Sequence, residues 1–147
     1  MVQSIDEYDA VDSAYVIEDS AGSVLGAQAT ILDSGVAHVD VTSTVSANIG
    51  VALGGLEDSL EAGYSSDISF TVSDDASAIA SELSEGDELN NADDVNVVGR
   101  TIDVADAAAV QNITAYDDID SAYVIEDSAG SVLGAQATIL DLSLIHI

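Results

Sequence analysis

The sequence contains no cysteine, no proline and no tryptophan, and Met1 and Phe70 are the only residues of their types. Without cysteine there is no disulfide scaffold, and transition-metal sites lack their usual thiolate ligands. Without proline, the turns have to be made by glycine, asparagine and aspartate. Aromatic residues total 4%, so the core has to consist of small and branched side chains, which suit thin, regularly stacked layers.

Basic residues are almost absent as well. Arg100 stands alone against 28 acidic residues, and the net charge is −27. Nucleic acid and anionic membrane are not expected as partners, because both are bound through Lys and Arg. Such a surface repels itself unless salt or divalent cations screen it, which favours an extracellular or cell-surface location.

What the chain does contain is a repeat. The segment Asp12–Asp33 recurs without change as Asp120–Asp141, an offset of 108 residues. Apolar residues make up 48% of the chain, so the repeats are expected to fold and not to stay disordered. By this register Met1 lies inside a repeat. We therefore expect residues 1–141 to be a piece of a tandem array, with neighbouring repeats of the same chain as partners.

Each 108-residue period divides into about four units that average about 27 residues. A unit begins with an alternating apolar run typical of a strand and continues with an alanine-rich stretch at helical spacing. The expected strands are 14–18, 36–42, 68–73, 100–104 (with a possible strand at 95–98 before it) and 122–126. The expected helical stretches are 20–32, 45–60, 75–83, 106–113 and 128–140.

One strand and one helix in every 20–30 residues indicate the α/β class, as a strand–helix solenoid with one parallel sheet. An all-β solenoid, or a string of sandwich repeats, is the alternative. It is kept because glycines such as Gly50, Gly54 and Gly55 weaken the helices that would contain them.

The runs AYVIEDSAGSVLGAQA and ISFTVSDDASAIASEL resemble repeats of very long bacterial surface or secreted proteins of the adhesin type. The resemblance implies a spacer or adhesive stalk. The last six residues, LSLIHI, depart from the repeat and resemble a translated sequencing adapter. We therefore expect residues 142–147 to be a non-native tail.

Acidic residues recur where each expected strand ends, at Glu18-Asp19, Asp74-Asp75, Asp106 and Glu126-Asp127. They could be a row of oxygen ligands for Ca²⁺ or the N-caps of the following helices. We favour capping, because Thr44 holds the same position in one unit and suits a cap better than a calcium ligand.

Two denser clusters are the candidate calcium sites if the protein binds metal. Neither follows the EF-hand loop, and we favour solvated turns, with weak calcium binding as the alternative. The candidate ligands are Asp87, Asn90, Asp93, Asp94, Asp117, Asp118 and Asp120.

No pattern indicates catalysis. His38 is the one credible base for a nucleophile, and no motif places a serine or threonine with it. Gly54-Gly55 lacks the lysine of a phosphate-binding loop. We therefore expect a structural or adhesive module and not an enzyme. A Ca²⁺-responsive binding module and a non-catalytic piece of a surface hydrolase are the alternatives.

Overall fold

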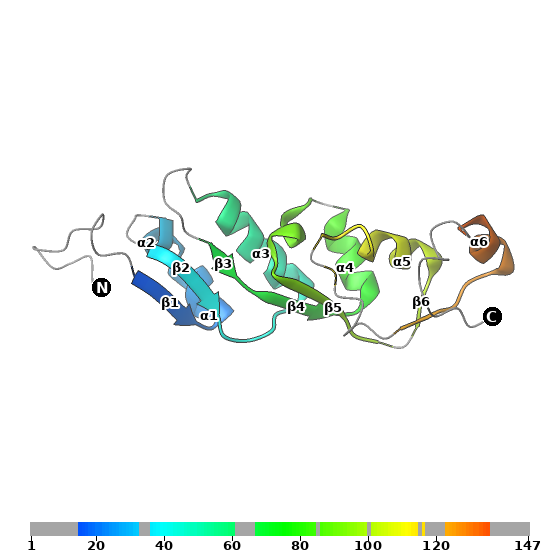
Figure 1. Ribbon diagram of the computed structural model, residues 1–147, viewed down its shortest axis with the longest axis horizontal. Coiled ribbons are helices and arrows are strands. Elements are labelled where there is room, and N and C mark those ends of the chain that lie inside the picture. Colours follow the sequence, from blue (N-terminus) through cyan, green and yellow to red (C-terminus); the bar gives the residue numbers. More distant parts are fainter. Residues whose placement is uncertain are drawn as a thin grey trace, which may run out of the picture.

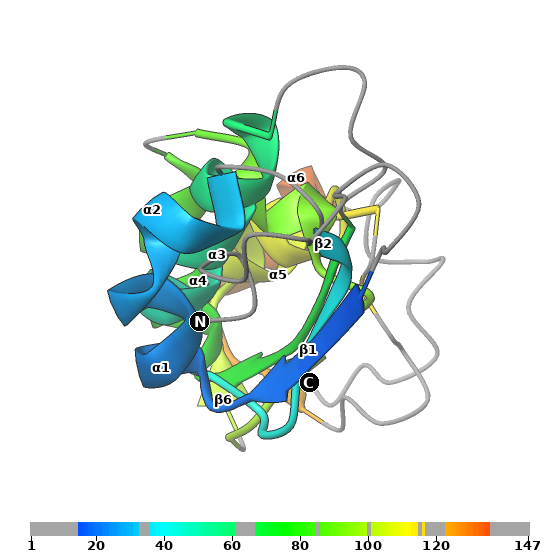
Figure 2. The same cartoon turned by 90° about the vertical axis from the view of Figure 1, so that its left-hand side faces the viewer.

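The computed structural model describes residues 15–32, 36–60, 67–84, 86–99, 101–114, 116 and 123–135. Within them the molecule is elongated, with strands along one side and helices along the other (Figure 1, Figure 2). The strands are β1 (Tyr15–Asp19), β2 (Val36–Val41), β3 (Ile68–Ser69), β4 (Thr71–Asp74), β5 (Asp94–Val97), β6 (Thr101–Ile102) and β7 (Val124–Ile125). The helices are α1 (Ala21–Gly26), α2 (Gln28–Leu32), α3 (Ala47–Asp58), α4 (Ala76–Leu83), the 3-10 helix η2 (Glu88–Asn91), α5 (Val104–Val110) and α6 (Ala129–Gly134).

All strand pairings among these residues are parallel. β1 pairs with β2, β2 with β3, β4 with β5 and β6 with β7, so each pair joins strands that follow one another in the chain. Isolated parallel bridges join Val45 to Val72 and Val95 to Tyr116. The expected α/β class with parallel strands is confirmed. The all-β alternative is wrong, because helices connect the strands.

The expectation of one sheet needs correction, because the strands form three small sheets of three, two and two strands. Paired strands are in register over most of their length, but the helices that follow them begin at different distances from the paired ends. Asp19 lies opposite Val41, yet α1 begins two residues after Asp19 and α3 begins six residues after Val41. The connection from β2 to α3 is therefore four residues longer than the connection from β1 to α1, and we call this difference the stagger of the two helices.

Long and short staggers alternate along the chain. Asp74 lies opposite Val97, and the helices that follow them are staggered by five residues. At the bridge between Val45 and Val72, the corresponding stagger is only two residues. The pairing of Ile102 with Ile125 also has a stagger of two. The strands follow one another along the long axis of the molecule (Figure 1).

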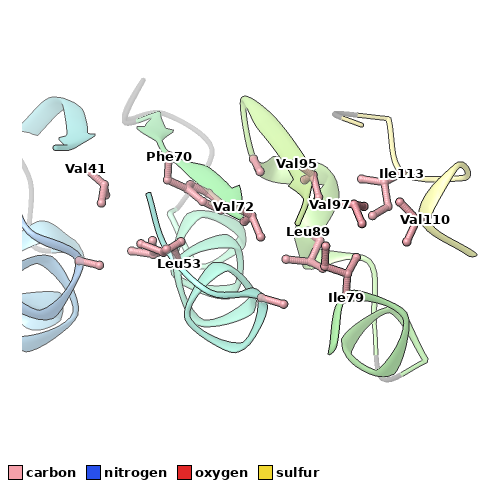
Figure 3. Packing of buried hydrophobic residues seen from close by; sticks show 14 of the residues in the cluster. Val41, Leu53, Phe70, Val72, Ile79, Leu89, Val95, Val97, Val110 and Ile113 are labelled. Carbon is pink, nitrogen blue, oxygen red and sulfur yellow. The ribbon is translucent and has the colours of Figure 1, made fainter. Parts of the chain in front are cut away.

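The buried side chains form one apolar cluster that runs between the helices and the strands along this axis (Figure 3). Phe70, Leu53, Leu56, Ile79 and Leu89 are among its largest fully buried members. The remainder is mostly valine, alanine and isoleucine, in agreement with the composition.

Glycines lie inside α3 because neighbouring elements approach its backbone closely. A Cβ atom on Gly50 would lie 2.6 Å from Cγ2 of Val72, and one on Gly54 would collide with the carbonyl oxygen of Glu88. Gly50 and Gly54, two of the glycines that supported an all-β interpretation, thus allow α3 to pack against β4 and η2. Their cost in helix propensity is offset by this packing.

The chain differs from the expected elements mainly around residues 86–104. The expected strand 100–104 ends at Ile102, and α5 begins at Val104. The strand proposed before it, at 95–98, is β5, and η2 is an element that the repeat pattern did not indicate. No helix in the described part of the chain is long and apolar enough to cross a membrane.

Candidate functional site

The strand-to-helix turns carry most of the polar contacts of the molecule, and they are the candidate site. Four of them have a side chain that caps the next helix. Ser20 accepts a hydrogen bond from Ser23 N, Asp75 from Ala78 N, Asp103 from Asp106 N and Ser128 from Ser131 N. Such caps satisfy N–H groups that have no partner inside the helix. The capping interpretation is confirmed for Asp75.

The assignment of the caps to Glu18-Asp19 and Glu126-Asp127 is wrong, because Ser20 and Ser128 cap α1 and α6. Two further positions, Thr44 and Asp106, are also wrong. The N-cap of α3 is Ser46, two residues after Thr44. The N-cap of α5 is Asp103, and Asp106 lies in the first turn, where its N–H donates to Asp103 at 2.8 Å. In both cases the strand ends at a different place from the one the repeat alignment assumed, so the cap moves with it.

In three turns the residue just before the cap is an aspartate. Ser20 N donates to Asp19 at 2.7 Å, Asp75 N to Asp74 at 2.9 Å and Ser128 N to Asp127 at 2.5 Å. Two of these carboxylates also reach the preceding helix. The other oxygen of Asp74, Oδ2, accepts from Ala47 N at 3.0 Å, and Oδ2 of Asp127 accepts from Val104 N at 3.3 Å.

Both contacts with the preceding helix occur where the two successive helices are staggered by two residues. A two-residue stagger brings the residue before one cap beside the first residue of the previous helix, where an unpaired N–H and the positive end of the helix dipole favour a carboxylate. Where the stagger is four or five residues, the residue before the second cap is Val45 or Ile102, so no carboxylate is available for the contact. We call the contact of Asp74 with Ala47 N, and of Asp127 with Val104 N, the junction cap.

Three turn carboxylates have lowered pKa values that follow from these bonds, those of Asp19, Asp75 and Asp127. The backbone N–H of Ser20, followed by the Ser23 hydroxyl, lowers the pKa of Asp19. The N–H of Ala78 lowers the pKa of Asp75, and the N–H of Ser128 lowers that of Asp127. These carboxylates are therefore held in their charged form.

A shallow hollow of about 240 Å³ lies beside the start of α4, between the Asp75 turn and β6. Asp75 and Asp106 are both in its lining, with Val98, Gly99 and Thr101. Burial, followed by the charges of Asp103 and Asp75, raises the pKa of Asp106. Within the described residues, no group of three or more His, Asp or Glu side chains has an arrangement that could hold a metal ion.

The candidate calcium ligands around η2 are not gathered into one cluster. Oδ1 of Asn90 accepts from Thr114 N at 2.9 Å, and Asp93 accepts a hydrogen bond from the Ser69 hydroxyl. Oδ2 of Asp94 accepts from Asn96 Nδ2 at 2.8 Å, and Asp87 is an exposed residue before η2. Asp117, Asp118 and Asp120 lie outside the described residues, as do Arg100 and His146. His38 lies in β2 and is half-buried.

A polar contact between α3 and η2 was missed from the sequence. Asn91 Nδ2 donates to the Gly54 carbonyl at 3.1 Å and to Asp58 Oδ1 at 2.9 Å. Nearby, burial and then the charge of Asp67 raise the pKa of Glu57 to about 7. Asn91 lies more than thirty residues after Gly54 and Asp58 in the chain, so no local motif could have indicated the contact.

Comparisons with protein-family models, with curated proteins and with solved structures gave no match for this chain.

Proposed function

We propose that the chain is a segment of an elongated α/β solenoid that acts as a structural or adhesive module outside the cell. The observation that carries the proposal is the parallel pairing of strands in chain order along the long axis of the molecule (Figure 1). An array built in this way gains length with every repeat, as a spacer or stalk requires.

The use of the turn carboxylates supports a structural role over a catalytic one. Asp74 and Asp127 each accept two backbone N–H groups from different turns, and Asp75 caps its own helix. Carboxylates engaged in this way hold neighbouring units together and are poorly suited to transfer protons. The recurring acids are therefore explained by the repeat architecture, without a reaction.

The extracellular location is proposed from composition. A net charge of −27 with a single basic residue favours a medium rich in salt or divalent cations. The resemblance to bacterial adhesin-type repeats points to the same location. A Ca²⁺-responsive module remains the second proposal, since Asp87 and Asp93 are exposed beside η2.

Small-angle X-ray scattering on chains with one and two 108-residue periods tests the elongated module. Parallel strands that pair in chain order along the long axis (Figure 1) should place the second period beyond the first. We expect the second period to increase the maximum dimension of the particle and to leave its cross-section unchanged. An unchanged maximum dimension would mean that the second period folds back on the first, which would contradict the proposal.

Titration with CaCl₂ and EGTA separates the two proposals. A structural module gains no more from calcium than from another salt of matched ionic strength. A calcium module would show a saturable rise in melting temperature that EGTA reverses, and Asp87→Asn with Asp93→Asn would abolish it.

A further inference from the structure

The same sequence occurs at two places in the structure and uses a different edge at each. β1 with α1 and β7 with α6 belong to the two identical segments, Asp12–Asp33 and Asp120–Asp141. β1 pairs with β2, the strand that follows it, in five positions. β7 pairs with β6, the strand that precedes it, through Thr101–Val124 and Ile102–Ile125.

Equivalent side chains in the two copies are buried to different extents, and each is more buried in the copy that has a neighbour on that side. In the first copy, Val24 of α1 is 1% exposed, whereas its counterpart Val132 is half-buried. In the second copy, Ile125 is 4% exposed, whereas Ile17 is only half-buried and Val16 is 57% exposed. Each copy therefore has the contacts that the other lacks.

The contacts of β7 with the preceding unit define what this segment recognises. Glu126 N donates to the Ile102 carbonyl at 2.9 Å, and Asp127 makes the junction cap on Val104 N. Glu18 and Asp19 are the same residues in the first copy. Among the described residues, no strand pairs with the corresponding edge of β1, which is the terminal strand of its sheet.

We propose that the free edge of β1 is a docking surface for the β6–α5 end of a second copy of this chain. In the complex, Glu18 N donates to the second copy's Ile102 carbonyl, and the Asp19 carboxylate makes the junction cap on Val104 N. The docked β1–α1 replaces that copy's own β7–α6. The inference goes beyond the proposed function, because it does not depend on the location of the protein or on its role.

The exchange favours the incoming segment for a physical reason. Among the described residues the displaced β7 pairs with β6 alone, and Leu133 in α6 is 70% exposed. The incoming β1–α1 remakes the same contacts with β6 and α5, and it keeps its own packing on β2 and α3. One end of a molecule binds the opposite end of the next, so the contact does not close into a two-fold dimer and the assembly can grow.

Proline at the two equivalent glutamates distinguishes the two edges. Alternate residues of a parallel strand face opposite neighbours, and the Asp19 carbonyl accepts from Thr42 N in the β2 direction. Glu18 N therefore faces the free edge. Glu18→Pro removes an N–H at a sheet edge, where proline is tolerated, and leaves the hydrogen bonds between β1 and β2. Glu126→Pro removes the bond to Ile102 and loosens β7.

Sedimentation velocity from about 1 µM to about 100 µM, a range that detects weak association, measures the outcome for the full chain. The buffer contains about 1 M NaCl, where the Debye length is about 3 Å. We expect the wild type to form a growing series of oligomers. Glu18→Pro should weaken association by about tenfold or more, as expected for a lost edge contact. Glu126→Pro should strengthen it, because the β6 edge is then free.

Circular dichroism verifies that each variant is folded, and Val16→Glu replaces Glu18→Pro if proline unfolds the chain. Val16 is exposed in this chain, so a charge there blocks docking without disturbing the fold. A wild type and a Glu126→Pro variant that both stay monomeric would overturn the proposal. So would an assembly that stops at a dimer, or the same change in association from both proline variants.

Discussion

The Oδ2 atom of Asp74 accepts a hydrogen bond from the backbone N–H of Ala47 at 3.0 Å, and so joins the end of β4 to the first residue of α3. Its Oδ1 atom accepts from Asp75 N at 2.9 Å. One carboxylate therefore fixes the position of two successive helices. Asp127 makes the same contacts with Val104 and Ser128, which indicates a recurring device and not a single accident of packing.

The first prediction is that Asp74→Ala lowers the free energy of unfolding by about 1 kcal/mol, the typical cost of losing an N-terminal cap. Two backbone N–H groups lose their acceptor, and one of them is part-buried. Asp74→Asn keeps one oxygen and is expected to fall between the wild type and Asp74→Ala. Urea unfolding monitored by circular dichroism measures the change.

Asp87→Ala is the matched control for this substitution. Asp87 is exposed and makes no side-chain cap on η2, so its removal takes away the same charge without a backbone contact. Its effect should stay within about 0.5 kcal/mol. Equal effects at the two positions would mean that Asp74 acts only through charge and not as a junction cap.

The repeat predicted the elements better than it predicted their contacts. Alternation and helical spacing identified β1, β2 and the helical stretches that contain α3 and α4, because each pattern depends on local burial. The junction cap was not identifiable, because Asp74 and Ala47 are 27 residues apart and Asp127 and Val104 are 23 apart. The stagger of successive helices decides which residues meet, and it depends on packing between units.

Gly54 is a second residue whose role depends on packing between distant segments and not on the local sequence. In the sequence a glycine inside a helical stretch counts against a helix. In the structure Gly54 is required, because the Glu88 backbone occupies the space where a Cβ atom would lie. Helix propensity is a local quantity and contains no information about η2, which arrives more than thirty residues later.

The second prediction compares Gly54 with its neighbour. Gly54→Ala should destabilise the protein by about 1–3 kcal/mol, the usual range for overpacking. Gly55→Ala should stabilise it by about 0.5–1 kcal/mol, because a Cβ atom there meets nothing within 4 Å and alanine is the better helix former. Thermal and urea unfolding of the two variants give the sign. A stable Gly54→Ala variant would mean that η2 does not pack against α3 as described.

The third prediction concerns pH. The pKa of Glu57 is raised from its ordinary value of 4.5 to about 7 by burial and by the charge of Asp67. Between these values the folded state holds a proton that the unfolded state has released, so the contribution of Glu57 to stability is fully present below about pH 4.5 and is lost as pH rises through about 7. Glu57→Gln removes this contribution. The variant should exceed the wild type in stability at pH 8, and the difference should shrink toward pH 5.

Asp87→Asn is the control, since it removes an exposed charge. A separate pH range applies to the carboxylates with lowered pKa values, Asp19, Asp75 and Asp127. Their contribution to stability is present above about pH 4 and is lost as pH falls below it. An advantage of Glu57→Gln that is the same at pH 5 and pH 8 would show that Glu57 does not hold a proton in the folded state.

The last prediction follows from the net charge of −27. The Debye length is about 30 Å at 0.01 M salt and about 3 Å at 1 M, so repulsion between exposed carboxylates is strong only in the dilute buffer. With a single basic residue, ion pairs cannot offset that repulsion. The melting temperature should therefore rise steeply between 10 mM and 1 M NaCl, and sodium sulfate should add little at equal ionic strength. Calcium should exceed NaCl at equal ionic strength only if the acidic clusters bind it. A melting temperature that is indifferent to NaCl would mean that the carboxylates are already too far apart, or too well engaged with backbone N–H groups, for their mutual repulsion to matter.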